Sequence, residues 1–283
     1  MSAAQHSTGE SPDLQDFSGR LVLVGAGKMG GALLEGWLRL GLDPQKVAVV
    51  EPSPSPQISA LAARGVKINP DVQTLGQAAA VVVAVKPQIA GQVMPALTPI
   101  IAASTVVVSI MAGKTLEFLA ATLSAPCALV RAMPNTPAAI GRGITVAVPM
   151  NASAAQRDLA HRLLAATGSV EWIAEEALMD AVTAVSGSGP AYVFLLAEAL
   201  AQAGAAAGLP AALAQRLARE TVAGAGELLH RSDLDAATLR QNVTSPGGTT
   251  AAALEVLMAD DGLAALMQRA VAAATRRSRE LAG

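Results

Sequence analysis

A short apolar run, Leu21–Val24, is followed at once by Gly25-Ala26-Gly27-Lys28-Met29-Gly30 and then by an apolar-periodic segment, residues 32–40. A strand, a glycine turn and a helix in this order form the fingerprint of a dinucleotide-binding unit. In that fingerprint Gly25 makes the tight turn, Gly27 lets a pyrophosphate approach the backbone, and Gly30 lets the helix pack closely on the strand. Because glycines also serve ordinary turns, the prediction depends on the order of the elements and not on the glycine spacing alone.

Short β-branched runs alternate with helical stretches from residue 20 to about residue 174, after which the β-type runs stop. This alternation predicts an α/β fold, with a Rossmann-type doubly wound parallel sheet in residues 20–174 and helices on both of its faces. The alanine- and leucine-rich residues 175–283 predict an all-α domain, and residues 1–19 a mobile tail. The predicted strands are residues 21–24, 47–50, 81–85, 105–110, 128–131 and 144–148.

The composition excludes several classes of protein. The net charge is −2 without a dense basic run, so neither nucleic acid nor an acidic membrane surface is an expected partner. A single cysteine, Cys127, excludes a disulfide within the chain and a cysteine zinc cluster, and three scattered histidines offer no metal-ligand spacing. We therefore expect no metal. The first 19 residues lack the apolar core of a signal peptide, which predicts a cytoplasmic protein.

Residues 87–113 carry no charge and are long enough to suggest a membrane span. Pro95 and Pro99 interrupt this stretch, so we expect a helix over residues 88–102 and a buried strand over residues 105–110.

The C-terminal domain carries little charge for its length, and segments such as residues 191–207 are apolar on nearly every side. A bundle of about a hundred residues cannot bury all of these faces, so we expect a partner subunit to cover some of them. Pro190 and Pro210 suit the first turns of helices, and Gly208 suits the position just past a helix end. The sequence thus predicts a homodimer or a larger homo-oligomer.

Ligands of open α/β sheets bind outside the carboxyl ends of the strands, so the loops after the strands form the candidate cofactor site. Glu51 ends the second run, where an acid would bind the adenosine ribose hydroxyls; a solvated acid at a strand end is the alternative. Lys86 would lie at a strand end, either close to the dinucleotide or as a solvated lysine. Asn135, in a rigid proline-flanked loop, suits a group near the nicotinamide or a purely structural turn.

Residues 244–250 read Thr-Ser-Pro-Gly-Gly-Thr-Thr and open an apolar helix. Glycines at 247 and 248 let backbone N–H groups converge, and the positive end of a helix favours a carboxylate or a phosphate. We therefore expect a small anionic substrate beside a nicotinamide.

The lysines discriminate between reductase mechanisms. All five, at positions 28, 46, 67, 86 and 114, lie in the first domain, and the second domain offers His230 and carboxylates as acid–base groups. Reducing a carbonyl requires a placed proton donor, whereas a protonated imine accepts hydride directly. The lysine distribution therefore favours a substrate with a C=N bond.

Five motifs together resemble the pyrroline-5-carboxylate reductase family, and the resemblance runs from about residue 21 to residue 281. The two motifs nearest the C-terminus are the most specific, because generic Rossmann proteins lack them. The motifs are Gly-Ala-Gly-Lys-Met-Gly at 25–30, Ala-Val-Lys-Pro at 84–87, Met-Pro-Asn-Thr-Pro at 133–137, Asp-Ala-Val-Thr-Ala-Val-Ser-Gly-Ser-Gly-Pro-Ala-Tyr at 180–192 and Asn-Val-Thr-Ser-Pro-Gly-Gly-Thr-Thr at 242–250.

The resemblance implies reduction of 1-pyrroline-5-carboxylate to L-proline with NADPH or NADH, the last step of proline synthesis. It also implies a Rossmann domain followed by a helical dimerisation domain, in a family whose dimers often assemble into decamers. The cofactor-binding residues expected from the motifs and the strand ends are Gly25, Ala26, Gly27, Lys28, Met29, Gly30, Glu51, Ser53, Ala84, Val85, Lys86, Pro87, Met111, Ala112, Gly113, Asn135 and, from the neighbouring subunit, Asn242.

For the substrate, the resemblance implies that the carboxylate meets the backbone of Gly248, Thr249 and Thr250. Glu176 and Asp233 would then lie near the ring, and Thr250 is the candidate catalytic residue that hydrogen-bonds the ring nitrogen. Ser186 and Ser188 would shape the loop that faces the nicotinamide; a helix-capping role is the alternative.

One departure from the family concerns the cofactor. NADPH-preferring members commonly place hydroxyls, amides or a basic residue after the second strand, whereas this chain has Glu51-Pro52-Ser53 and no arginine there. An acid repels a 2′-phosphate, so NADH is expected to serve at least as well as NADPH. The alternatives to the main reading are another imine or hydroxy-acid reductase, and a nucleotide-sensing module without catalysis.

Overall fold

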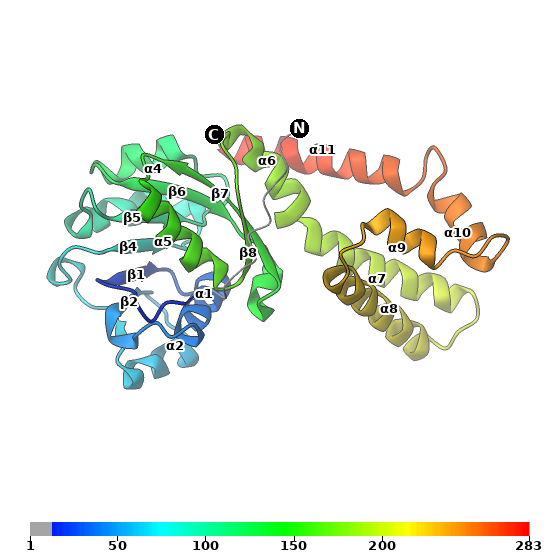
Figure 1. Ribbon diagram of the computed structural model, residues 1–283, viewed down its shortest axis with the longest axis horizontal. Coiled ribbons are helices and arrows are strands. Elements are labelled where there is room, and N and C mark those ends of the chain that lie inside the picture. The colour runs from blue at the N-terminus through cyan, green and yellow to red at the C-terminus, as the bar shows by residue number, and fades with distance from the viewer. Residues whose placement is uncertain (1–12, 283) are drawn as a thin grey trace. The chain divides into compact units, whose positions relative to one another are not determined.

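The computed structural model describes residues 13–282, which divide into two compact units (Figure 1). The first unit runs to Gly187 and takes in the last turns of the chain from Arg277, and the second unit is Ser188–Arg276. The sequence placed the division earlier, after residue 174. Residues 175–187 stay with the first unit because Met179 and Ala184 are buried there, and Met179 belongs to the sheet's core.

One eight-stranded sheet forms the first unit. Its strand order is β3-β2-β1-β4-β5-β6-β7-β8. The first six strands in this order, β3-β2-β1-β4-β5-β6, are all parallel to one another. Taken alone, these six strands have the order 3-2-1-4-5-6 of a doubly wound dinucleotide-binding fold, which confirms the predicted fold class. The strands are β1 (Leu21–Val24), β2 (Val47–Val50), β3 (Lys67–Ile68), β4 (Ala80–Val83), β5 (Val106–Ser109), β6 (Ala128–Met133), β7 (Gly143–Met150) and β8 (Gly168–Trp172).

The prediction of a parallel sheet is wrong at β7. β7 pairs antiparallel with β6, Met133 lying opposite Val146. Residues 134–142, which connect the two strands, fall short of the dozen or so residues that a parallel crossover needs. β3 and β8 were not predicted, since β3 has two residues and β8, Gly-Ser-Val-Glu-Trp, has one β-branched residue.

Helices cover both faces of the sheet, as predicted. On one face α1 and α5 contribute Trp37 and Leu163 to a core with Leu21 and Leu23, and the Trp37 indole donates to the Leu163 carbonyl at 2.7 Å. On the other face Leu119 of α4 packs with the opposite sides of β1 and β4. The α-helices of this unit are α1 (Lys28–Arg39), α2 (Pro56–Ala60), α3 (Ala90–Val93), α4 (Leu116–Leu123), α5 (Ala154–Ala165) and α6 (Met179–Val182).

Two local predictions are corrected. The single helix expected over residues 88–102 is instead a 3₁₀ turn, the short α3 and a second 3₁₀ segment, Met94–Ile100, because Pro95 and Pro99 have no N–H to donate. Residues 13–19 of the expected mobile tail are docked on the first unit. Leu14 and Phe17 are buried in its core, and the Leu14 N–H donates to the Leu40 carbonyl at 3.0 Å. Residues 1–12 of that tail lie outside the described part of the chain.

The second unit is helical, as predicted. α7 and α8 form a hairpin in which a Cβ on Gly204 would lie only 3.3 Å from the Ala214 Cβ. Gly208, with φ +100°, lies just past the end of α7. Pro190 lies in the first turn of α7, and Pro210 is the residue before α8. The helices are α7 (Gly189–Ala206), α8 (Ala211–Arg231), α9 (Ala236–Asn242), α10 (Thr249–Leu257) and α11 (Leu263–Ala282).

Candidate active site

The predicted cofactor loops follow neighbouring strands at the carboxyl edge of the sheet. Val24 at the end of β1 lies beside Val83 at the end of β4, and Val83 lies beside Ser109 at the end of β5. The chain reverses its winding direction between β1 and β4, so this edge holds the topological switch point where ligands of such sheets bind. The structure thus brings residues 25–30, 84–87 and 111–113 to one edge.

The glycine loop fits a dinucleotide in three ways. Gly25 has φ +91°, and a Cβ there would lie 2.7 Å from the Ala84 carbonyl oxygen. A Cβ on Gly30 would lie 2.1 Å from the Gly25 carbonyl oxygen, so only glycine lets α1 start this close to β1. A Cβ on Gly27 would meet no described atom within 4 Å. The backbone is therefore open on the side from which a pyrophosphate would approach.

Gly27 is also the N-cap residue of α1. Since it has no side chain to cap the helix, the first-turn N–H groups are available to an external anion. The exposed Lys28 begins the helix and adds a cation there. The predicted start of this helix, residue 32, is too late, because glycines at 30 and 31 weaken a helical pattern.

Glu51 contacts the glycine loop directly. Its carboxylate accepts the Ala26 N–H at 2.9 Å and the Ser53 N–H at 3.1 Å. Asn69, which no motif in the sequence marks, holds the Glu51 backbone: its side chain accepts the Glu51 N–H at 2.8 Å and donates to the Glu51 carbonyl at 2.9 Å. Glu51 is therefore held against the glycine loop by hydrogen bonds and is not a freely solvated acid.

Among the other candidate cofactor residues, one is exposed to solvent and others are held by hydrogen bonds or lie in a turn. Lys86 is exposed, at the end of the β4 loop. The Met111 N–H donates to Ser109 Oγ at 3.3 Å, and Gly113 turns the chain with φ +72°. Asn135 Oδ1 accepts the Ile144 N–H at 3.0 Å, so this side chain ties the β6 loop to β7. That bond gives Asn135 a structural role, whether or not it also meets the cofactor.

The anion nest, residues 244–250, lies in the second unit. The Gly248 N–H donates to the Ser245 carbonyl at 3.0 Å, and Gly247 between them has φ +68°. Gly248 is the N-cap of α10 and has no side chain to cap it. The Gly248 N–H is thus already used, and the donors open to a carboxylate are those of the first turn of α10, which begins with Thr249 and Thr250.

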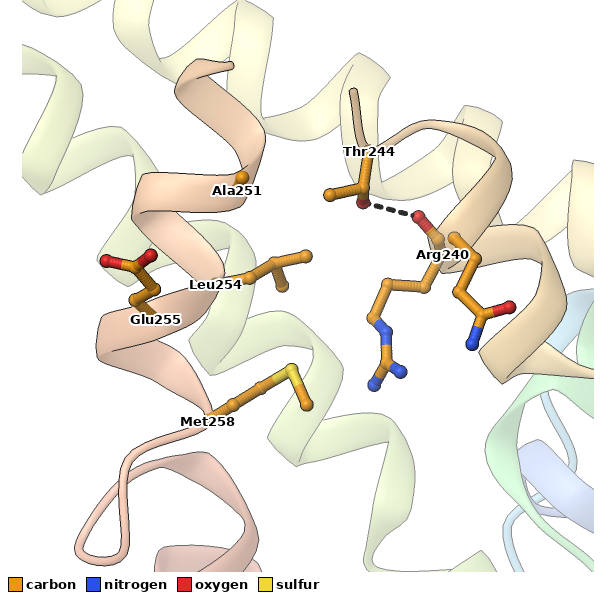
Figure 2. Close-up of a pocket in the computed structure, with 7 residues that line it drawn as sticks. Arg240, Thr244, Ala251, Leu254, Glu255 and Met258 are labelled. Atoms are coloured by element: carbon orange, nitrogen blue, oxygen red, sulfur yellow. Dashed lines mark hydrogen bonds between the residues drawn. The ribbon is translucent and has the colours of Figure 1, made fainter. Parts of the chain in front are cut away.

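A hollow lies behind the nest, between α9 and α10, with a volume of about 510 Å³. Figure 2 shows the Arg240 guanidinium facing Leu254 and Met258 across it, while Glu255 points away from Arg240. The Thr244 hydroxyl donates to the Arg240 carbonyl at 2.7 Å and ties the nest to the end of α9.

The two predicted carboxylates differ in their surroundings. Glu176 Oε1 accepts a hydrogen bond from Arg131 Nη1 at 2.7 Å and from the Leu116 N–H at 2.9 Å. Arg131 is 5% exposed, so Glu176 neutralises a buried guanidinium as well as capping α4. Asp233 is exposed, just before α9. Glu176 belongs to the first unit, and Asp233 with the nest to the second.

Ser186 and Ser188 occupy an unusual turn. Residues 183–187 form a π-helical turn before α7, a feature often found at functional sites. Ser188 is the N-cap residue of α7, yet its hydroxyl makes no capping bond within residues 13–282, which argues against the capping alternative. Ser186 Oγ is buried without a hydrogen-bond partner in the described part of the chain.

The other reactive side chains have structural surroundings. Burial raises the pKa of the Cys127 thiol, so it stays protonated and is a poor nucleophile. His161 Nδ1 accepts the Trp172 indole N–H at 3.2 Å. Among residues 13–282, no cluster of three His, Cys, Asp or Glu side chains suits a metal ion.

The chain is similar to two protein families and to several known proteins. A family model described as pyrroline-5-carboxylate reductase dimerisation matches residues 176–281, and one described as NADP oxidoreductase, coenzyme F420-dependent, matches residues 20–113. The pyrroline-5-carboxylate reductase of Pseudomonas aeruginosa is 38% identical over 265 residues, covering 93% of this chain and 97% of that protein. The corresponding enzyme of Mycobacterium leprae is 40% identical over 93% of this chain and 96% of its own length.

Solved structures agree. A pyrroline-5-carboxylate reductase from Coxiella burnetii superposes with a TM-score of 0.87 at 33% identity, over 94% of this chain and 99% of that one. A pyrroline carboxylate reductase from Plasmodium falciparum, solved with NADP bound, gives a TM-score of 0.77 at 29% identity, over 93% and 98% of the two chains. These matches confirm the resemblance found in the motifs: the chain belongs to the pyrroline-5-carboxylate reductase family.

Proposed function

We propose that the protein reduces 1-pyrroline-5-carboxylate to L-proline with a hydride from NADPH or NADH, the final step of proline biosynthesis. The observation that carries the proposal is the open anion nest at the start of α10, in a chain whose glycine loop fits a dinucleotide. Family membership over nearly the whole chain supports the same substrate.

The glycine loop and Glu51 would hold the cofactor, whose nicotinamide supplies the hydride when bound. The first-turn N–H groups of α10, those of Thr249 and Thr250 included, would bind the ring carboxylate, because they are uncapped donors at the positive end of a helix. The Thr250 hydroxyl would hydrogen-bond the ring nitrogen. The imine carbon accepts the hydride, and the nitrogen keeps the proton with which the substrate arrives. No strong acid is then needed, which agrees with the distribution of the lysines.

Glu176 and Asp233 have different parts in this proposal. Glu176 shares its Oε1 between Arg131 and the α4 N-terminus, so we assign it to positioning the residues around it. Asp233 is exposed and stays a candidate for a contact near the ring. Asn242, the last residue of α9, is exposed and is proposed to reach the cofactor of a neighbouring subunit.

The assembly is proposed to be a homodimer built on the helical domain, with decamers as a further step. Large apolar side chains on α7 are exposed, Phe194 by 69% and Leu195 by 62%. By length and composition the helical stretch 176–206 could also cross a membrane. It falls within the match to a dimerisation family, which favours a second subunit as the cover. We propose a cytoplasmic location, without nucleic acid or membrane partners.

The proposed function is tested by following reduced nicotinamide at 340 nm with 1-pyrroline-5-carboxylate as substrate. Turnover should require the ring carboxylate, so 1-pyrroline, which lacks it, is the matched control. Equal turnover of both compounds would indicate a general imine reductase. Turnover of 2-oxo acids in place of the imine would indicate a hydroxy-acid reductase, and cofactor binding without any turnover a nucleotide-sensing module.

A further inference from the structure

We propose that Glu51 and Asn69 together make this protein select NADH over NADPH, with Glu51 contacting the adenosine ribose and Asn69 positioning Glu51. The inference rests on the dinucleotide site of the proposed function. It concerns the ribose end of the cofactor, so it does not depend on which imine is reduced.

Asn69 lies directly after β3, and its side chain continues the pairing between β2 and β3. Its backbone N–H donates to the Val49 carbonyl at 2.8 Å. Its amide oxygen then accepts the Glu51 N–H at 2.8 Å, and its amide nitrogen donates to the Glu51 carbonyl at 2.9 Å. A donor and an acceptor on one short side chain replace the next backbone pair of the ladder. The backbone of Glu51 is thereby fixed one residue beyond the end of β2.

The conformation of Asn69 suits this role. Its φ is +49°, in the left-handed region that asparagine adopts more readily than most other residues. An alanine there would lose both hydrogen bonds to Glu51, and it adopts this left-handed backbone conformation less readily than asparagine does.

The Glu51 carboxylate is fixed as well. One oxygen accepts the Ala26 N–H at 2.9 Å and the other accepts the Ser53 N–H at 3.1 Å. Each carboxylate oxygen can accept about two hydrogen bonds, so each keeps a free position for a ribose hydroxyl. The side chain could move aside only by breaking its bonds to the backbone of the glycine loop and the β2 loop.

A fixed carboxylate discriminates against a 2′-phosphate. At neutral pH that phosphate is largely a dianion, which has no O–H group to donate to Glu51 and is repelled by its charge. Residues 51–57 contain no lysine or arginine that could offset the repulsion. Lys28 is the one cation of the glycine loop, and its exposed side chain begins α1. For NADH to be preferred, the repulsion by the fixed carboxylate must outweigh the attraction by Lys28.

The experiment measures binding without substrate, using the full chain. NADH and NADPH are titrated and followed by nicotinamide fluorescence, and 5′-AMP and adenosine 2′,5′-bisphosphate are then used to displace NADH. Wild-type protein should bind NADH at least about tenfold more tightly than NADPH, and 5′-AMP should displace NADH better than the bisphosphate does. Tighter binding of NADPH by the wild type would overturn the proposal.

The variants separate contact from positioning. Glu51→Ser should shift the ratio of the two dissociation constants roughly tenfold toward NADPH, and Glu51→Gln should shift it in the same direction. Asn69→Ala should shift the ratio about threefold, because the carboxylate stays but is no longer fixed. Asp71→Asn removes a nearby charge from the same segment and should leave the ratio unchanged.

Two results would contradict the proposal. An unchanged ratio in Glu51→Ser would show that Glu51 does not meet the ribose. In Asn69→Ala, an equal loss of affinity for both cofactors would show that Asn69 supports the fold alone. Neither result affects the assay with 1-pyrroline-5-carboxylate, so failure of this inference and failure of the proposed function are distinguishable.

Discussion

The two units of the molecule differ in how far each completes its own core. In the first unit, strands such as β1 and β4 are buried on both faces, with side chains at most 1% exposed. In the second unit, residues 188–276, the buried apolar residues are Ala214 and Ala218, while Phe194 is 69% exposed. The first unit can therefore fold around its own sheet, whereas the second needs another surface against its helices.

The candidate cofactor loop and the anion nest differ in the same way. The cofactor loop is tied to the rest of its unit by internal hydrogen bonds such as that between Ala26 and Glu51. The nest before α10 closes its own turn, but its helix has an uncapped N-terminus. Changes in the first unit should consequently act on fold and cofactor, and changes in the second on assembly and substrate.

The largest effect is expected from Phe194→Asp, which tests whether a second subunit covers α7. A carboxylate placed in an apolar interface costs several kcal/mol in each subunit. The dimer should therefore dissociate roughly ten-thousandfold more readily. Sedimentation equilibrium measures the mass, and Phe194→Leu, which keeps an apolar side chain, is the matched control. An unchanged mass for the aspartate variant would show that another face forms the dimer.

Gly30→Val tests the rigidity of the first unit. The new Cβ would lie 2.1 Å from the Gly25 carbonyl oxygen, so either α1 or the loop must move. We expect cofactor binding to weaken roughly a thousandfold, and the free energy of unfolding to fall by about 2–3 kcal/mol. Titration with NADH and chemical denaturation measure the two effects.

The control for that variant is Gly91→Ala in α3, where a Cβ meets no described atom within 4 Å. It should leave both quantities nearly unchanged. Cofactor affinity close to wild type in Gly30→Val would show that the loop tolerates a side chain and that the contact between α1 and β1 is not needed.

In the first unit, the strands that could be predicted are those whose signal lies in their own residues. β1 and β2 were predicted with the bounds that the structure gives them, because each is a continuous buried apolar run. β8 was missed because it alternates half-buried and exposed residues and carries few β-type side chains. The antiparallel direction of β7 depends on the length of its connection to β6 and not on the residues of the strand.

The candidate site residues divide in the same way, into those marked by a local motif and those that depend on contacts between distant parts of the chain. The glycine loop, Glu51 and the nest carry spacings that can be read from the chain. Asn69 could not be found in this way, because its role depends on the register of β2 against β3. The bond from Glu176 to Arg131 likewise joins residues far apart in the sequence, and no motif marks it.

Thr250→Ala tests the chemistry assigned to the second unit. If the hydroxyl orients the ring nitrogen of a substrate that is already protonated, turnover should fall about 10- to 1000-fold and not vanish. The pH profile should lean toward acid, because the substrate must then supply its proton unaided. Turnover is measured from pH 6 to 9. The matched control is Thr249→Ala, which removes the neighbouring hydroxyl and keeps the backbone N–H assigned to the carboxylate. Complete inactivation of a folded variant that still binds cofactor would make the hydroxyl essential and the proposed mechanism wrong.

The smallest effect is expected from Gly248→Val. From the N-cap position a side chain reaches the N–H groups of the second and third residues after it, here Thr250 and Ala251. The methyl groups of a valine would therefore lie where the substrate carboxylate is proposed to bind. Its backbone, with φ −84° and ψ 175°, suits any residue, although a Cβ there would lie 3.2 Å from the Ser245 carbonyl oxygen. The turn must shift slightly to make room, and the fold should be retained. The KM for substrate should rise about tenfold while the KM for cofactor stays the same.

Gly248→Ser sharpens that prediction, because its hydroxyl can accept those N–H groups itself. It should stabilise α10 by a few tenths of a kcal/mol and still raise the KM for substrate, since the cap and the carboxylate compete for the same donors. Stability and substrate affinity would then change in opposite directions. A serine variant that is more stable and binds substrate as well as the wild type would show that the carboxylate binds elsewhere, and the nest would be only the start of a helix.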